Sequence, residues 1–295
     1  MKSVVLNVCQ GVGDIFWVYQ KFAPYFDKIH FNVCQIPGQD DTIQNRAEPF
    51  LRLLPKTGTV GLKRVSAKEY DKLAADRFSM RKILDEYAAG EIIFDYACNK
   101  PLEEGIRIEE IDPGLLVEET ANIKVAEAPI AYPPGSYVAV YVSGAVKQNH
   151  PLKLGAWPPV KWAEFVKALC DDFNFRKPII LVGASYDKDA IQETQNLLKK
   201  MKFETTSYID SWAANVLYII KNSVLFIGYQ SGLNILADNM DVPQVMMYFP
   251  FLERMQRAWA KKRNLENGIH NPALFTQPIP DILNSLEKLK THLKR

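Results

Sequence analysis

The chain has 295 residues, of which 47% are hydrophobic and 24% are charged, and its formal net charge is +2. This composition is that of a globular protein and excludes disordered and fibrous chains. The small net charge provides no overall attraction to nucleic acid or to an acidic membrane surface. The four cysteines are widely spaced and the four histidines lack the spacing of a helical metal site. We therefore expect reduced thiols and no metal.

Strands and helices are expected to alternate along the first part of the chain. An apolar run at 4–8 predicts a buried strand, and an apolar face predicts a helix over 13–25. The same patterns predict further strands at 28–35, 59–65 and 91–96, and further helices at 42–54 and 67–89.

A segment rich in proline and small residues, 127–136, is the expected linker, and the alternation starts again after it. Strands are predicted at 137–142, 177–183, 203–207, 223–228 and 243–249, and helices at 160–172, 187–201, 211–222, 231–240 and 280–293. Strands separated by helices of about 10–15 residues indicate parallel sheets. The sequence therefore predicts an α/β fold with two Rossmann-like halves.

The first of four notable loops contains Gly11, Gly13 and Asp14 and follows the first predicted strand. Ligands of open α/β sheets bind outside the carboxyl ends of the strands, so this loop is in a suitable place. It lacks the third glycine of a dinucleotide-binding loop, and a carboxylate repels phosphate. A glycine turn with Asp14 at the start of a helix is the alternative interpretation.

Two further loops also follow predicted strands. Ser143 and Gly144 would let backbone N–H groups approach an anion, and Lys147 adds a cation, although an exposed surface lysine is the simpler interpretation. The loop from Gly183 to Ser185 suits a nucleobase or a ribose, because its exposed backbone could form hydrogen bonds, or it is an ordinary connection.

The fourth loop is the most informative, because a strand ends at Gly228 and a Ser231-Gly232 pair opens a helix. Helix N-termini bind anions through free N–H groups and a partial positive charge, so a diphosphate would be well placed here. Alternatively, Ser231 is a plain N-cap, which contributes about 1 kcal/mol.

These four loops, in this order, resemble those of the heptosyltransferase-like glycosyltransferases, family nine of the glycosyltransferases, which have the GT-B fold. The resemblance covers most of the chain and rests on GVGDIFWVYQKF, VSGAVKQNHPLKLGAWPPVKWAEF, PIILVGASYDKD and SWAANVLYIIKNSVLFIGYQSGLNILADNMDVPQVMMY. It implies an inverting, metal-independent transfer of a sugar from a nucleoside-diphosphate sugar to an acceptor hydroxyl. No cofactor beyond this donor substrate is implied.

The resemblance also implies roles for individual residues. Asp14 matches the base that deprotonates the acceptor, and Lys147 matches a lysine that contacts phosphate, so these two are the expected catalytic residues. The donor is expected at Ser143, Gly144, Gly183, Ser185, Gln230, Ser231 and Gly232, and the acceptor beside Gly11 and Gly13. Gln230 and Ile235 stand where the family has aspartate and histidine, so the resemblance implies the reaction type but not the sugar.

A GT-B chain would have an acceptor domain over 1–133 and a nucleotide-sugar domain over 134–279, with parallel sheets facing each other across a cleft. The segment 280–295 would be a helix that crosses back to the first domain. We expect a nucleotide sugar and a carbohydrate or lipid-linked saccharide as partners, rather than nucleic acid, and no transmembrane segment. The expected location is cytoplasmic, or peripheral to the inner membrane for a lipid acceptor.

Two alternatives stay open. A phage or accessory glycosyltransferase could act on modified DNA or on protein, and the basic run at 261–263 leaves room for nucleic acid, although a solvated helix face explains that run more simply. A catalytically idle GT-B module could bind a nucleotide or a partner, which the replacements at Gln230 and Ile235 would explain.

Overall fold

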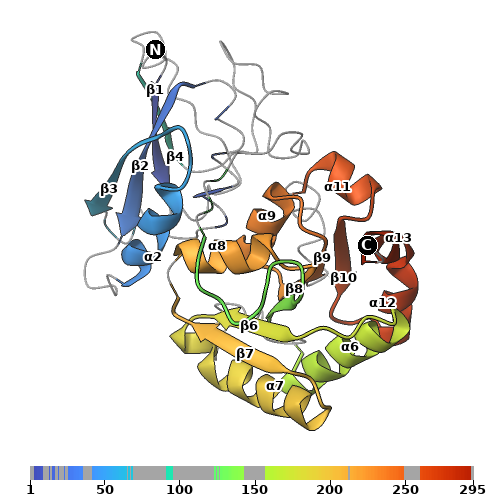
Figure 1. Cartoon of the computed structure of the whole chain (residues 1–295). Helices are drawn as coiled ribbons and strands as arrows, with labels where there is room; N and C mark the ends of the chain where they lie inside the picture. Colours follow the sequence, from blue (N-terminus) through green and yellow to red (C-terminus); the bar gives the residue numbers. More distant parts are fainter. Residues whose placement is uncertain are drawn as a thin grey trace. The chain divides into compact units, whose positions relative to one another are not determined.

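The computed structural model describes residues 3–8, 26–35, 42–64, 91–95, 127–142, 157–211, 213–248 and 260–293, and single positions at 13, 15, 16, 19, 23, 66, 68, 123 and 125. The chain forms two compact units (Figure 1). The first comprises 1–124, and the second comprises 125–295 apart from 257–259.

Residues 125–133, which we expected in the first domain, group with the second unit. The reason is local packing. Ile130 and Tyr132 pack against the core of the second unit, and the N–H of Ala131 donates to the hydroxyl of Tyr208 at 2.9 Å.

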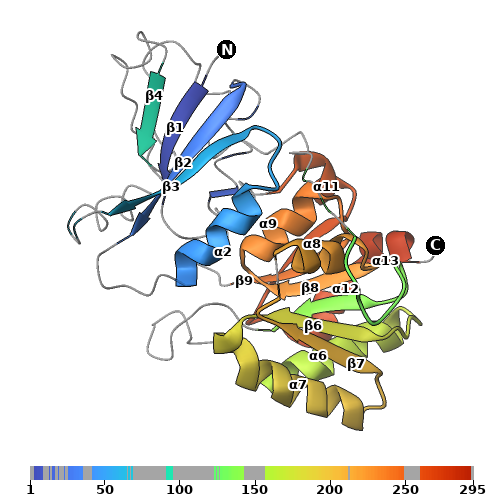
Figure 2. The same cartoon turned by 60° about the vertical axis from the view of Figure 1, so that its left-hand side comes forward.

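The first unit contains a four-stranded parallel sheet in the order β3-β2-β1-β4 (Figure 2). These strands confirm the predicted ones, and in the first two along the chain buried apolar positions, such as Val4 and Leu6, alternate with more exposed ones. Gly13, Ile15, Phe16 and Tyr19 are helical, as the pattern over 13–25 predicts. The predicted helix at 67–89 lies outside the described residues except for Lys68. The elements are β1 (Ser3–Val8), β2 (Lys28–Gln35), α2 (Thr42–Leu51), β3 (Thr57–Arg64) and β4 (Glu91–Asp95).

The second unit contains a six-stranded sheet in the order β10-β9-β8-β5-β6-β7, in which every strand pair is parallel. Five of its strands confirm predictions to within a few residues. The sequence patterns do not predict β10, because Pro272 argues against a strand. Proline is tolerated there because β10 is the edge of the sheet. The strands are β5 (Val138–Tyr141), β6 (Ile179–Gly183), β7 (Thr205–Ile209), β8 (Leu225–Tyr229), β9 (Gln244–Tyr248) and β10 (His270–Leu274).

Helices cover both faces of this second sheet. α6 (Pro159–Asp172) and α7 (Lys188–Lys200) lie on one face, and α8 (Ala213–Lys221) and α9 (Gly232–Asn239) lie on the other (Figure 1). This change of face accompanies the reversal of strand order after β7, since right-handed crossovers place helices on opposite sides when the chain turns back. The remaining short helices are α11 (Lys262–Glu266), α12 (Ile279–Ser285) and α13 (Glu287–Leu293).

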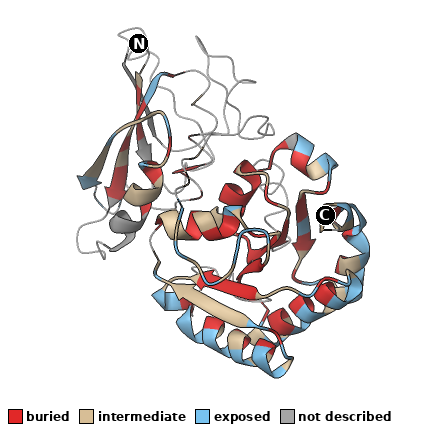
Figure 3. Ribbon diagram, in the orientation of Figure 1, coloured by how far each residue is buried: buried red, intermediate tan, exposed pale blue. Residues whose placement is uncertain are grey.

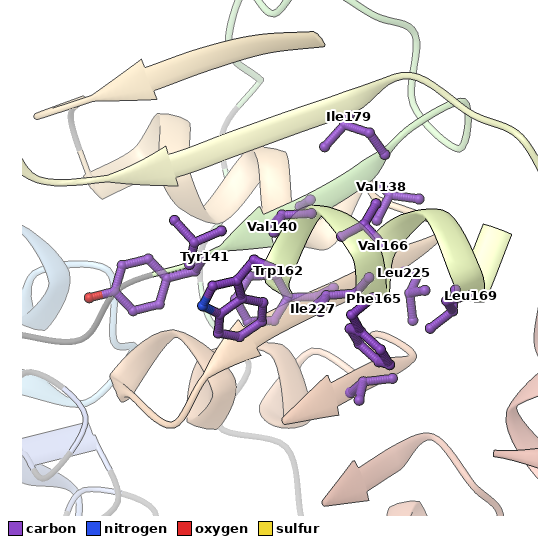
Figure 4. Close-up of a cluster of buried hydrophobic side chains, with 14 of the residues drawn as sticks. Val138, Val140, Tyr141, Trp162, Phe165, Val166, Leu169, Ile179, Leu225 and Ile227 are labelled. Carbon is purple, nitrogen blue, oxygen red and sulfur yellow. The ribbon is translucent and has the colours of Figure 1, made fainter. Parts of the chain in front are cut away.

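The core of the second unit lies between α6 and the central strands, where buried side chains of Trp162, Phe165 and Val166 meet Val140 of β5 and Ile227 of β8 (Figure 4). The central strands β5, β6, β8 and β9 are buried almost throughout, whereas the edge strand β7 is half-buried and the outer faces of α6 and α7 are exposed (Figure 3). Burial on both faces explains why these strands read as continuous apolar runs.

The predicted helix at 280–293 is two short helices that meet at Leu286, and its packing back on the first domain stays a prediction. Ile282, Leu286 and Leu289 are buried in the core of the second unit. The ammonium group of Lys290 lies 3.0 Å from the carboxylate of Asp172 at the end of α6. The apolar stripe of this segment is therefore covered by α6.

Candidate functional site

The strand order of the second sheet reverses between β5 and β8, which are neighbours with Tyr141 opposite Gly228. Ligands in open α/β sheets bind in the crevice outside the carboxyl ends of the strands at such a reversal. Gln230, Ser231 and Gly232 follow β8 directly, so three of the predicted donor residues lie at this point.

Ser231 is the N-cap of α9, with φ −160° and ψ 174°. Its hydroxyl oxygen accepts a hydrogen bond from the N–H of Leu233 at 3.2 Å and donates to Oδ1 of Asn234 at 3.3 Å. The N–H of Asn234 bonds to the carbonyl of Ser231 at 3.1 Å. The hydroxyl proton is therefore directed at Asn234, and the N–H of Gly232 is the donor of this first turn left for an anion in the described part of the chain.

A buried polar network holds α9 against the sheet from behind. Nδ2 of Asn234 donates to Oε1 of Gln244 at 3.0 Å, and Nε2 of Gln244 donates to the carbonyl of Asn234 at 3.0 Å. Nδ1 of His270 lies 3.0 Å from Nε2 of Gln244 and 3.2 Å from Oδ1 of Asp238. These side chains come from α9, β9 and β10, so the network sets the position of the helix start relative to both strands.

The network continues to Lys261, whose side chain is fully buried. The backbone N–H of Lys261 donates to Asp238 at 2.8 Å, and its ammonium group donates to the carbonyl of Asn239 at 2.8 Å and to Asp241 at 2.6 Å. Arg263 also pairs with Asp241, at 2.6 Å. A solvated basic face at 261–263 is therefore the wrong interpretation. Lys261 and Arg263 both form ion pairs with the carboxylate of Asp241, and the side chain of Lys261 is buried.

The pKa values of Lys261 and Asp241 are both lowered, but for different physical reasons. Burial lowers the pKa of Lys261, and the attraction to Asp241 offsets this only in part. Burial alone would raise the pKa of Asp241, but the hydrogen bond and charge of Lys261, with help from Asn264 and Arg263, bring it below its usual range. The pair thus stabilises the carboxylate without fully compensating for the buried ammonium group.

The loop from Gly183 to Ser185 is occupied by the protein's own carboxylates. The N–H of Ala184 donates to Asp187 at 3.1 Å, and the N–H of Ser185 donates to Asp210 at 2.9 Å. A Cβ atom on Gly183 would lie 2.5 Å from Cδ1 of Ile191, so a side chain here would force Ile191 of α7 to shift. The structure therefore favours an ordinary connection over a backbone contact with a nucleobase.

Two tyrosines at this edge of the sheet, Tyr141 and Tyr229, were not expected from the sequence. Burial raises the pKa of Tyr141 well above its usual value, and the charge of Asp187 and a hydrogen bond with Tyr186 add to the shift. Burial raises the pKa of Tyr229 to about 12. Both phenols stay neutral near pH 7, where they can donate hydrogen bonds but cannot act as bases. The signal in the sequence was their position at strand ends.

The two residues that depart from the family pattern are both buried. Ile235 is 3% exposed, which is the environment of a core side chain. Gln230 is 9% exposed, and its Oε1 atom has no hydrogen-bond partner among the described residues. The backbone N–H of Gln230 bonds to the carbonyl of Met247 at 2.9 Å, which fixes the loop to β9.

Of the other predicted site residues, the structure describes only one. Gly13 is buried and helical, whereas Gly11, Asp14, Ser143, Gly144 and Lys147 lie outside the described residues. The roles of all these residues, and the cleft between the domains, stay predictions. Among the described residues no cluster of three or more histidine, cysteine, aspartate or glutamate side chains could hold a metal. No helix of the described ranges is long and apolar enough to cross a membrane.

Comparison with family models and with curated proteins found no match. Solved structures do match along the whole chain. The Escherichia coli heptosyltransferase WaaC with ADP is 10% identical, with a TM-score of 0.59, over 97% of this chain and 99% of that one. The Escherichia coli ADP-heptose lipopolysaccharide heptosyltransferase II is 14% identical, with a TM-score of 0.59, over 100% of both chains.

A glycosyltransferase of family 9 from Veillonella parvula is 10% identical, with a TM-score of 0.56, over 98% of this chain and 97% of that one. Identities this low establish likeness of fold alone. The expected fold class, α/β with two parallel sheets in two domains, is confirmed. The chain therefore has the GT-B fold of the heptosyltransferases and of a family nine glycosyltransferase.

Proposed function

We propose that the protein is a glycosyltransferase that moves a sugar from a nucleoside-diphosphate sugar to an acceptor hydroxyl, with inversion and without a metal. Asp14 is the proposed base and Lys147 the proposed phosphate ligand. The observation that carries the proposal is the anchored start of α9. It presents the N–H of Gly232 at the reversal of strand order, in a fold shared with heptosyltransferases over the full chain.

The chemistry follows from these positions. A diphosphate at Gly232 would meet the positive end of the α9 dipole, and the network behind Asn234 would keep that end fixed. Nucleoside diphosphate is a good leaving group once its charge is neutralised, so the protein's main remaining task is to remove the acceptor proton. A carboxylate within hydrogen-bond reach of the hydroxyl does this. The acceptor is proposed to be a carbohydrate or a lipid-linked saccharide.

ADP and ADP-heptose are the first ligands to test, because the matched structures are of a heptosyltransferase with ADP and of an ADP-heptose heptosyltransferase. In a thermal unfolding assay with a panel of nucleoside diphosphates and nucleotide sugars, a true donor held at about 100 times its Kd stabilises the protein by about 2.7 kcal/mol. A panel without any stabilising ligand would contradict the proposed donor class.

Asp14→Asn tests the proposed base with the donor identified in that panel. Transfer should fall by a factor of about 10²–10⁴, since the amide cannot accept the acceptor proton, while donor affinity stays the same. Asp27→Asn, a change of the same kind at an exposed residue of the first unit, is the control and should transfer normally. Transfer at the wild-type rate by Asp14→Asn would show that the base is another group.

The burial of Gln230 and Ile235, where the family has aspartate and histidine, favours a second candidate function, an idle nucleotide-binding module. This function predicts donor binding in the panel with neither hydrolysis nor transfer. Turnover of any nucleotide sugar rules it out.

A further inference from the structure

Two adjoining hollows lie at the amino-terminal ends of the strands of the second sheet, and both are lined by Arg176 and Lys177. The larger has a volume of about 350 Å³ and is also lined by Asn174 and His292. The smaller has a volume of about 200 Å³ and adds Lys202. We call these hollows together the basic groove. Since a strand rises about 3.3 Å per residue, the groove lies roughly 16 Å from the strand ends that carry Ser231.

The cations of the basic groove have no acidic partners among the described residues. Arg176, Lys177 and Lys202 form no ion pair there, whereas other cations of this unit, such as Lys167 with Asp171, are paired. Among the described residues, no carboxylate lines the larger hollow. Glu204 lines the smaller one, where its side chain bonds to Tyr132. The groove therefore has a local positive potential that the net charge of the whole chain does not reveal.

Arg176 is held in one orientation. One of its Nη atoms donates to the carbonyl of Met201 at 2.6 Å, and the guanidinium lies 4.5 Å from the centre of the Phe203 ring. A guanidinium has five N–H donors in a rigid fork, so several remain for a ligand. This fork matches two oxygens of a phosphate, and an orientation fixed in advance reduces the entropy lost on binding.

The other polar groups complete a set suited to phosphate. Nε2 of His292 donates to the carbonyl of Asn267 at 2.9 Å, which fixes the ring at the edge of the hollow. Asn174 has φ 47°, a conformation set by its place after α6, where the N–H of Phe175 bonds to the carbonyl of Cys170 at 2.8 Å. The side-chain amide of Asn174 makes no hydrogen bond within the described ranges, so it offers another donor.

We propose that the basic groove is a second binding site, separate from the proposed nucleotide-sugar site, for a phosphate group carried by a small metabolite or by a lipid headgroup. A volume of about 350 Å³ falls at the lower end of the range of small-molecule sites. Arg176 and Lys177 line both hollows and Lys202 lines the smaller one. Phosphate, rather than a carboxylate, fits this group of cations, because it carries more charge and more acceptor oxygens.

The test uses the full chain. Inorganic phosphate is titrated by calorimetry at low ionic strength, and cosedimentation is measured with vesicles of phosphatidylcholine alone or mixed with phosphatidylglycerol. The Lys177→Gln/Lys202→Gln variant removes two cations that make no hydrogen bond to described residues, so the fold is expected to be retained, which thermal unfolding checks. The Lys167→Gln/Arg263→Gln variant removes two cations that are paired elsewhere on the unit and keeps the net charge matched.

Saturable phosphate binding that weakens about tenfold or more in the groove variant, but not in the control variant, supports a soluble phosphorylated ligand. Binding to the anionic vesicles alone, with the same dependence on the groove, supports a lipid headgroup. Binding that persists in the groove variant, or that falls equally in both variants, overturns the proposal, as does the absence of binding to either probe. These outcomes are independent of whether the protein transfers a sugar.

Discussion

At the scale of single residues, burial decides what a charged or polar side chain does. Lys261 and Arg263 are near neighbours in one basic run, yet the first is fully buried and the second is exposed. Ser231 shows the same dependence on its surroundings. Its hydroxyl could contact an anion, but it donates its hydrogen bond to Oδ1 of Asn234 instead, because Gln244 fixes the side-chain amide of Asn234. Neither outcome can be read from the residue type.

Asp241→Asn should make the protein less sensitive to acid. The folded-state pKa of Asp241 lies below its usual value, so the carboxylate contributes stability above its unfolded-state pKa of about 3.9 and loses it as the pH falls through the folded-state value. Urea unfolding at about pH 7 and about pH 3 measures the effect. The wild type should lose more free energy of unfolding between these pH values than the variant.

The matched control for this prediction is Glu164→Gln, which removes an exposed carboxylate from α6. It should lose the same free energy of unfolding as the wild type over the same pH range. An equal loss in wild type and Asp241→Asn would show that the ion pair with Lys261 does not stabilise the folded state.

At the scale of secondary-structure elements, the apolar periodicity predicts where most strands and helices lie, but not how they end. α6, α7 and α9 each end in a Schellman motif, in which the bonds from Phe175 to Cys170, from Phe203 to Leu198 and from Val242 to Ala237 close the last turn. The residues with positive φ in these motifs are Asn174, Lys202 and Asp241, rather than glycine. The usual glycine signal for a helix end was therefore missing from the sequence.

The contact between β6 and α7 predicts a coupled pair of substitutions. Gly183→Ala should lower the free energy of unfolding by about 1–3 kcal/mol, because its Cβ would lie 2.5 Å from Cδ1 of Ile191. Ile191→Val alone should cost about 0.5–1.5 kcal/mol. The double variant should lose clearly less free energy of unfolding than the sum of the two single losses, because valine lacks the Cδ1 atom that clashes.

Chemical denaturation of the four proteins measures this coupling. If the two costs simply add to within about 0.5 kcal/mol, the close approach of α7 to β6 is not what requires glycine at this position.

At the scale of the whole molecule, the sequence was sufficient to predict the fold class but not every domain assignment. Both units are parallel sheets, as alternating strands and helices indicated. The apolar side chains Ile282, Leu286 and Leu289 of the C-terminal segment 280–295 are buried in the core of the second unit. An amphipathic helix shows that one face must be covered, but it does not show which surface covers it.

Leu286→Ala should therefore destabilise the second unit by about 2–5 kcal/mol, because it removes a side chain that is 1% exposed in the core. Leu283→Ala, a neighbour that is only partly buried, is the matched control and should cost less. Thermal unfolding followed by circular dichroism compares the two variants. A control variant that is destabilised as much as Leu286→Ala would contradict the packing of this segment.

The sequence by itself determined the class of this protein. Apolar periodicity located most of the strands and helices, and the Ser231-Gly232 pair marked the start of α9. Tertiary structure alone decided the strand order, the edge strand that contains Pro272, and the carboxylates that occupy the N–H groups of Ala184 and Ser185. The physical reason is the range of the interactions. Periodicity records which face of a segment leaves water, whereas the partner of that face comes from contacts between residues far apart in the chain.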